Sequence, residues 1–137
     1  MSTNGRAAPL SVALDEAECI ALLASTSLGR IGTSIDAMPV VLPVAYAVHD
    51  DTVVFRTTPG TKLHAATLDS VVALQADSYA AAHEPEGWSA LMQGPTHAIT
   101  DPATLAVVSE LPLGRWAHDG TYVALDPAIV TGRRLQY

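Results

Sequence analysis

The sequence predicts an α+β domain, mainly β, built on an antiparallel barrel with short flanking helices. Six or so strand-like segments are separated by short helical ones, without the regular strand–helix–strand repeat of a parallel sheet. The chain has 137 residues, the length of one domain. Its apolar share of 49% against 15% charged residues is typical of a folded domain with a buried core and excludes intrinsic disorder.

The N-terminal part of the chain predicts a tail followed by a helix. Residues 1–10 are expected to form a flexible tail, and residues 11–137 the single domain. Asp15 followed three residues later by Glu18 resembles a capping box. Apolar residues then recur at helical spacing, so a helix is expected over residues 16–25.

The next segments predict short strands joined by turns. A strand is expected over residues 28–33, and a long Val-rich strand over residues 39–48. The sequence His-Asp-Asp at residues 49–51 predicts a tight turn, which makes residues 52–57 the second strand of a hairpin.

The second half of the chain alternates helices and strands. Asp101 followed by Pro102 predicts a helix start, because Asp is a favoured N-cap and Pro suits the first helical position. That helix is expected to end by Pro112. The other expected elements are a helix over residues 61–68 and strands over residues 71–77, 88–100, 122–125 and 129–135.

Charge and hydropathy exclude several classes of partner. The formal net charge of −7 argues against nucleic acid, whose binding needs a basic surface. The longest notable uncharged apolar run, residues 37–48, is too short and too interrupted by proline to cross a membrane. Acidic residues precede any apolar run of signal-peptide length, so a cytoplasmic location is expected. Cys19 is the single cysteine, which excludes an internal disulfide and a cysteine metal cluster.

The most informative feature is the position of the sole lysine. Lys62 and Arg56 flank a loop of Thr, Pro and Gly that leaves a strand and enters a helix. Unpaired backbone N–H groups at a helix start, threonine hydroxyls and two cationic side chains together favour a phosphate. A solvated turn with two ordinary surface cations is the alternative. The loop matches neither the nucleoside-triphosphate motif nor the dinucleotide fingerprint.

Two further segments are candidates for holding a flat ring. Pro39 and Pro43 remove two N–H groups from one strand, which predicts an edge or bulge whose backbone can bond a polar ring, or an edge that blocks aggregation. Trp88 follows a glycine at the start of a strand, where its side chain can wall a pocket or pack in the core.

At these residues the chain resembles the flavin-binding split barrels related to pyridoxamine 5′-phosphate oxidase. It is most similar to the small actinobacterial and nitroimidazole-resistance-type members. The resemblance covers residues 14–135. The matching pieces are Leu-Gly-Arg-Ile at 28–31, Pro39 to Val44, Val-Phe-Arg-Thr at 54–57 with Gly-Thr-Lys-Leu at 60–63, Gly-Trp-Ser at 87–89 and Thr-Gly-Arg-Arg at 131–134.

The resemblance implies a six-stranded split barrel that forms a homodimer, with FMN in the cleft between the two copies. It implies that Arg56, Thr58 and Lys62 hold the phosphate, with Thr57 and Thr61 as lesser donors. It places Val41, Leu42, Pro43 and Val44 against the isoalloxazine ring. It also implies that Trp88, Ser89 and Arg133 reach the flavin from the partner or border the substrate space.

The function implied is an FMN-dependent oxidoreductase acting on a small-molecule substrate. A deazaflavin-dependent reductase of the same fold and a non-enzymatic protein that stores or senses flavin are the alternatives. No acid or base is identified from the sequence. Haem needs an axial ligand, and the five histidines show no ligand spacing. True pyridoxamine-phosphate oxidases carry extra C-terminal substrate residues, so vitamin B6 oxidation is not expected.

Overall fold

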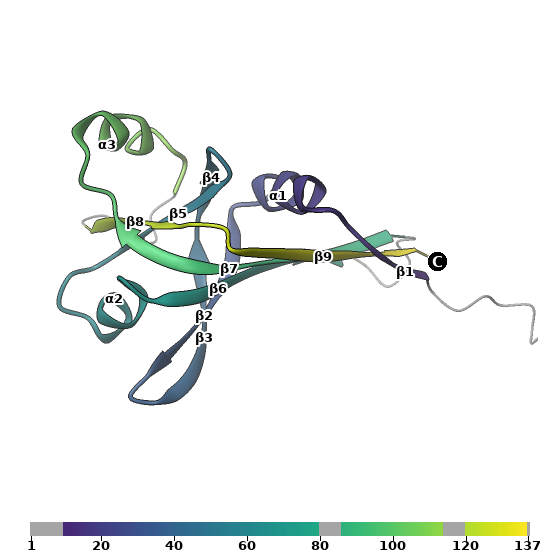
Figure 1. The fold of residues 1–137 in the computed structure, drawn as a ribbon, viewed down its shortest axis with the longest axis horizontal. Coiled ribbons are helices and arrows are strands. Elements are labelled where there is room, and N and C mark those ends of the chain that lie inside the picture. The colour runs from purple at the N-terminus through teal and green to yellow at the C-terminus, as the bar shows by residue number, and fades with distance from the viewer. Residues whose placement is uncertain (1–9, 80–85, 114–119, 137) are drawn as a thin grey trace, which may run out of the picture.

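The computed structural model describes residues 10–79, 86–113 and 120–136 of the chain (Figure 1). In these ranges nine strands form an antiparallel sheet that is curled into a half-barrel, and three short helices flank it. This architecture confirms the predicted fold class. The structure has nine strands rather than the expected six or so, because the segment expected as one strand over residues 39–48 is divided into two and because β1 was not expected. The strands are β1 (Leu10–Ala13), β2 (Leu28–Ile35), β3 (Met38–Ala45), β4 (Ala47–His49), β5 (Thr52–Thr57), β6 (Val71–Ser78), β7 (Glu86–Ala98), β8 (Thr121–Leu125) and β9 (Ile129–Gln136), and the helices are α1 (Glu16–Ala24), α2 (Lys62–Thr67) and α3 (Pro102–Val108).

Strand β7 joins the two halves of the barrel. Its first part, residues 86–93, pairs with β9, and its last part, residues 96–98, pairs with β8. One half therefore runs in the order β3-β2-β6-β7-β9-β1 and the other in the order β7-β8-β5-β4. Figure 1 shows β6, β7 and β9 running lengthwise through the molecule, with α2 at one end and β1 at the other.

The expected single strand over residues 39–48 is wrong, because the chain changes sheets at Tyr46. Strand β3 pairs with β2, whereas β4 pairs with β5. Between them the Tyr46 N–H donates to the Ser27 carbonyl at 3.0 Å. An uninterrupted apolar pattern gives no sign of such a change, since both pieces face the same core.

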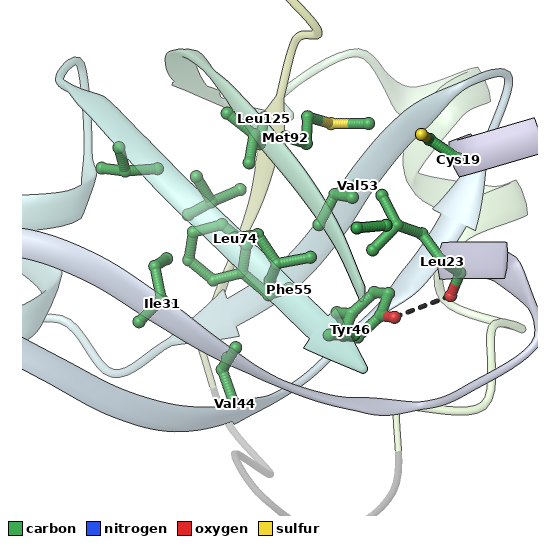
Figure 2. Packing of buried hydrophobic residues seen from close by; sticks show 14 residues of the cluster. Cys19, Leu23, Ile31, Val44, Tyr46, Val53, Phe55, Leu74, Met92 and Leu125 are labelled. Carbon is green, nitrogen blue, oxygen red and sulfur yellow. Dashed lines mark hydrogen bonds between the residues drawn. The ribbon is translucent and has the colours of Figure 1, made fainter. Parts of the chain in front are cut away.

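Helix α1 closes the barrel and is fixed by its predicted cap. Asp15 accepts the Glu18 N–H at 2.8 Å, and the Glu18 side chain accepts the Asp15 N–H, so the capping box is confirmed. The helix buries Cys19 and Leu23 in the main core. The Tyr46 hydroxyl donates to the Leu23 carbonyl at 2.7 Å, which ties the helix to the point where the chain changes sheets (Figure 2).

The remaining boundaries differ in detail from those expected. Helix α3 begins as predicted, with Asp101 as N-cap and Pro102 in its first turn, and ends at Val108, before Pro112 as expected. Strand β1 was not predicted, and it takes Leu10 out of the expected tail to pair with β9. The rest of that tail, residues 1–9, lies outside the described residues.

None of the helices in the described ranges is long and apolar enough to cross a membrane.

The β2–β3 turn generates a first stability prediction. Asp36 and Ala37 have φ of 52° and 65°, and the pair Ile35–Met38 closes a two-residue turn of type I′ around them. A left-handed alanine costs roughly 1–2 kcal/mol. We therefore expect Ala37→Gly to raise the free energy of unfolding by about 0.5–1 kcal/mol in denaturant titration. The control Ala73→Gly, inside β6, should lower it, and a loss of stability in Ala37→Gly would contradict the turn.

The bond between Tyr46 and Leu23 generates a second prediction. Tyr46→Phe removes one buried hydrogen bond and should lower the free energy of unfolding at pH 7 by about 1 kcal/mol. Burial raises the pKa of the Tyr46 phenol far above its usual range. The neutral phenol therefore stabilises the fold fully below about pH 10, the unfolded value, and this contribution is lost as the pH rises further. Denaturation at pH 7 and pH 11 should show a smaller alkaline loss in the Phe variant, and equal losses would contradict the assignment.

Candidate functional site

The loop after β5 is a compact turn with an open outer side. Residues 58–61 read Thr-Pro-Gly-Thr, and the Thr61 N–H and hydroxyl both donate to the Thr58 carbonyl, at 3.3 and 2.8 Å. Gly60 has a φ of 88°, which together with Pro59 fits a type II turn. A Cβ added at Gly60 would meet no atom within 4 Å, so the space over the turn is free.

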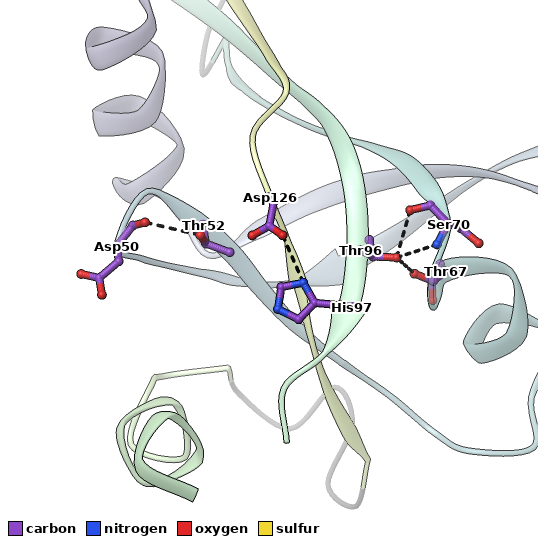
Figure 3. A network of polar contacts seen from close by, with 7 residues as sticks. All are labelled: Asp50, Thr52, Thr67, Ser70, Thr96, His97 and Asp126. Carbon is purple, nitrogen blue, oxygen red and sulfur yellow. Dashed lines mark hydrogen bonds and ion pairs between the residues drawn. The ribbon is translucent and has the colours of Figure 1, made fainter. Parts of the chain in front are cut away.

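Helix α2 is held against the barrel on the inner side of this loop. Thr61 caps it by accepting the His64 N–H at 3.1 Å. The Thr57 hydroxyl, on a residue that is only 3% exposed, lies 2.7 Å from His64 Nδ1. At the far end of the helix, the Thr96 hydroxyl donates to the carbonyls of Thr67 and Ser70 (Figure 3). The loop therefore starts and ends on fixed points.

Arg56 points away from this helix. Successive residues of a strand face opposite sides, so Arg56 and the inward-facing Thr57 diverge. The Arg56 guanidinium lies 4.6 Å from the centroid of the Tyr122 ring, and its Nη2 donates to the Gly120 carbonyl at 3.4 Å. Its Nε atom is buried without a hydrogen-bond partner. These contacts brace the end of β5, and direct contact of Arg56 with a phosphate stays a prediction.

Lys62 is the exposed cation of the loop. Its side chain is 79% exposed, and its Nζ atom lies 3.1 Å from Asp36 Oδ2 in the β2–β3 turn. A pair this exposed contributes little to stability and can open at small cost. The structure thus gathers Thr58, Thr61 and Lys62 around one accessible turn, with Asp36 as a partner that sequence reasoning missed.

The predicted ring segment lies on an edge strand. Strand β3 ends one side of the sheet and pairs with β2 alone in the described chain. Val41 and Pro43 face outwards and are exposed, with Val41 68% exposed, whereas Val44 is buried and Leu42 packs against the core. Prolines are tolerated where a strand N–H would point away from the sheet, so we expect the backbone of Val41 to face the open edge.

Trp88, Ser89 and Arg133 lie at the other end of the sheet. Trp88 is half-buried and packs against the main core, as the alternative of core packing predicts. Ser89 faces outwards opposite Arg133 and lines a hollow of about 490 Å³ with it. The Arg133 guanidinium donates to the hydroxyl and the carbonyl of Ser11, which ties β9 to β1.

A second hollow of about 460 Å³ lies on the outer side of β2 and β6, beside α2. Small residues make room for it, because Gly32 lies opposite Ala73 with no large side chain between them. Sequence reasoning missed this hollow, although a glycine inside a strand is a signal of close approach. Its lining includes Gly32, Ser34, Ala66, Ser70, Ala73 and Gln93.

One chain does not bring all the predicted residues together. The loop and α2 lead into β6 at Val71, whereas Ser89 pairs with Asp77 near the end of that strand. Six residues of a strand span about 20 Å, which is longer than a single flavin ring system. Within one chain, the loop and Ser89 therefore lie at opposite ends of the pairing between β6 and β7.

Comparison with known proteins gives a family match over most of the chain. The family described as pyridoxamine 5′-phosphate oxidase matches residues 15–134. An uncharacterised protein of Mycobacterium tuberculosis is 36% identical over 95% of this chain and 91% of its own length.

Solved structures share the fold over nearly the whole chain. The structure described as the FAD binding protein from Mycobacterium smegmatis is similar with a TM-score of 0.78 and 32% identity, covering 93% of this chain and 99% of that chain. A putative 5-nitroimidazole antibiotic resistance protein from Bacteroides thetaiotaomicron has a TM-score of 0.70 over 94% of this chain and 90% of that chain. Its 12% identity shows the fold alone.

Proposed function

Since the chain belongs to the pyridoxamine 5′-phosphate oxidase family, we propose that it is a flavin-dependent oxidoreductase, with FMN as its cofactor and a small molecule as its substrate. The observation that carries this proposal is the open Thr-Pro-Gly-Thr turn with the exposed ammonium of Lys62 beside it. A phosphate monoester is the group that hydroxyl donors and one mobile cation fit best.

The residues present fit a flavin phosphate. The Thr58 and Thr61 side chains are exposed on the turn. To reach a dianion, the Thr61 hydroxyl would turn from the Thr58 carbonyl and Lys62 would turn from Asp36. We propose that these three residues hold the phosphate, with Arg56 and Thr57 fixing the strand end beneath it. The outward backbone of residues 41–44 then lies against the ring. The hollow lined by Gly32 and Ala73 gives the flat cofactor access to the sheet.

We further propose that the protein acts as a homodimer. The outer face of the long sheet carries apolar side chains that are unusually exposed, among them Val41, Val71 and Ile129 at 68%, 76% and 56%. Such a surface is typical of one that a partner covers. A second copy on this face would bring the Ser89 end of one sheet to the loop end of the other, which a single chain cannot do.

In this arrangement the cofactor supplies the hydride chemistry, and the protein supplies binding, orientation and exclusion of water. The Thr-Pro-Gly-Thr turn fixes the phosphate end, and β3 fixes the ring by backbone groups that do not titrate. Apolar side chains such as Val41 would then shield one edge of the ring from solvent.

A flavin-storing or flavin-sensing protein is the second candidate. One observation favours it: the described residues that line the two outer hollows include no Asp, Glu, His or Cys. His64, the histidine of α2, is bonded to Thr57. The chain therefore offers little proton chemistry at the proposed site, and turnover would depend on the substrate.

Native mass spectrometry of freshly purified protein tests the cofactor and the dimer together. A dimer carrying two FMN masses supports the proposal. FAD, as in the name of the M. smegmatis protein, or a deazaflavin would change the cofactor but keep the site.

A turnover assay separates the two candidate functions. Flavin that is bleached by a reductant and reoxidised by an added acceptor at a catalytic rate supports the oxidoreductase. Bound flavin without turnover for any donor supports the store, and a colourless monomer that takes up no flavin contradicts both.

Lys62 generates a direct prediction. Lys62→Ala removes one charge-assisted hydrogen bond to the phosphate and leaves Asp36 to repel it, so the affinity for FMN should fall by about 1.5–3 kcal/mol, or about ten- to a hundredfold. Fluorescence titration of FMN measures this. Lys62→Arg keeps the charge and should recover most of the affinity. Equal binding by the Ala variant and the unchanged protein would remove Lys62 from the site.

Asp36 generates the opposite prediction. Asp36→Asn frees Lys62 from its present partner and removes a negative charge near the phosphate, so the affinity for FMN should rise about two- to fivefold. Asparagine also tolerates the left-handed φ of 52° at this position. The control is Asp51→Asn, a similar change in the β4–β5 turn at a φ of 61°. A weaker complex in Asp36→Asn would contradict the exchange of partners.

A further inference from the structure

A cavity of about 340 Å³ lies on the other sheet of the barrel, between α3, the β4–β5 turn and the ends of β7 and β8. None of the residues predicted for the flavin lines it. Its floor is apolar and buried, formed by Val54, Ile99, Val108 and Ala124. A volume of this size suits a small organic molecule rather than a nucleotide.

The polar side of this cavity carries carboxylates and imidazoles. His97 Nδ1 lies 3.1 Å from Asp126 Oδ2, and His49 Nε2 lies 3.4 Å from Asp50 Oδ2. Figure 3 shows His97 of β7 facing Asp126, which directly follows β8, with Asp50 and Thr52 on the adjoining β4–β5 hairpin. Asp101 is the fifth titratable group of the lining, and no described lysine or arginine lines the cavity.

Two of the carboxylates are free to meet a ligand. Asp101 accepts hydrogen bonds from the N–H and the hydroxyl of Thr104, and these bonds lower the pKa of its carboxyl. The Asp101 carboxylate is therefore already engaged as the N-cap of α3. Among the described residues, Asp50 and Asp126 have only their histidine neighbours as side-chain partners, and their side chains are 91% and 47% exposed.

Both carboxylates are held in position by the backbone. Asp50 and Asp51 are the left-handed residues of a two-residue turn, with φ of 47° and 61°. The Asp126 N–H donates to the Pro95 carbonyl at 3.0 Å. At Gly94 an added Cβ would lie 1.8 Å from the Asp126 carbonyl oxygen, so this close approach of backbones requires glycine. The backbone that carries both carboxylates is therefore fixed by the turn and by this close approach.

The geometry points to a second binding site in this cavity, for a small organic cation: an amine whose apolar body rests on Val54 and Ala124 and whose ammonium lies between Asp50 and Asp126. An imidazole that donates Nδ1–H to a carboxylate presents Nε2 as an acceptor, so a neutral His97 can also accept from the ammonium. An anion would meet three carboxylates and no cation here. A metal ion is a poorer match, because the described side chains offer no group of three suitable ligands.

The test is a ¹H–¹⁵N NMR titration of the full chain, free and saturated with FMN, with 2-phenylethylamine as the cationic probe. We expect saturable shifts confined to amides of residues 49–54, 97–101 and 124–126, with a dissociation constant in the low millimolar range, unchanged by FMN. The neutral 2-phenylethanol, which has the same shape, should bind at least fivefold more weakly, and 3-phenylpropionate should not bind.

Charge-removing variants assign the contact. Asp50→Asn and Asp126→Asn should each weaken binding of the amine about two- to fivefold. Asp51→Asn removes the same charge from the same turn but does not line the cavity, so it should leave the affinity within experimental error. Equal affinity for the amine and the alcohol, stronger binding of the carboxylate, shifts scattered over other regions, or no saturation at 20 mM would each overturn the site.

Discussion

The alternation of side chains across β2, β6 and β7 is the constraint on which both faces of this molecule depend. Ile31, Leu74 and Met92 lie side by side in register, and each is at most 1% exposed. The next row along the same strands, Gly32 and Ala73 among its members, faces outwards and forms the hollow beside α2. A slip of one residue would turn the core outwards and fill the hollow at the same time. The register that closes the core therefore also builds the surface to which we assign the flavin.

This dependence explains why the proposed site is divided between the two ends of the sheet. The loop around Lys62 connects β5 to α2, which leads into β6 at Val71, while Ser89 pairs with Asp77 near the other end of β6. The barrel interior is filled by close-packed side chains and offers a cofactor no room. A cofactor must therefore use the outer face, where exposed apolar residues such as Val71 also favour a second copy. In the dimer that we propose, the cofactor and the second copy would share this one surface.

The features of the fold that depend on contacts between residues close in sequence could be predicted from the sequence. The features that depend on long-range contacts could not. The capping box at Asp15 and the cap at Asp101 are contacts over three residues, so the sequence alone determines them. The change of sheet at Tyr46 depends on Ser27 and Leu23, which are about twenty residues away. The partner of Lys62 was hidden for the same reason, because Asp36 lies 26 positions earlier.

Strand geometry also limits what proximity in sequence can say about a site. Arg56 and Lys62 are six residues apart and read as one cationic cluster, yet alternation sends Arg56 to the ring of Tyr122 on the other face of β5. The sequence pattern does not show which side of β5 Arg56 faces, and it does not show the cavity near His97. The lining of that cavity comes from β4, β5, β7, α3 and β8. Only the tertiary register brings those residues together.

The net charge of −7 adds a physical condition to both proposals. A dianionic phosphate approaches a protein that repels it as a whole, and charges beyond about 8 Å are largely screened at physiological ionic strength. The Thr-Pro-Gly-Thr turn must therefore act at contact distance, through hydroxyls and the single ammonium of Lys62. The same overall charge favours the approach of a cation to the cavity beside Asp126. A site for an anion and a site for a cation can coexist on one small acidic domain, because the charge that each site binds depends on side chains within a few ångströms. The two hollows also lie on different halves of the barrel.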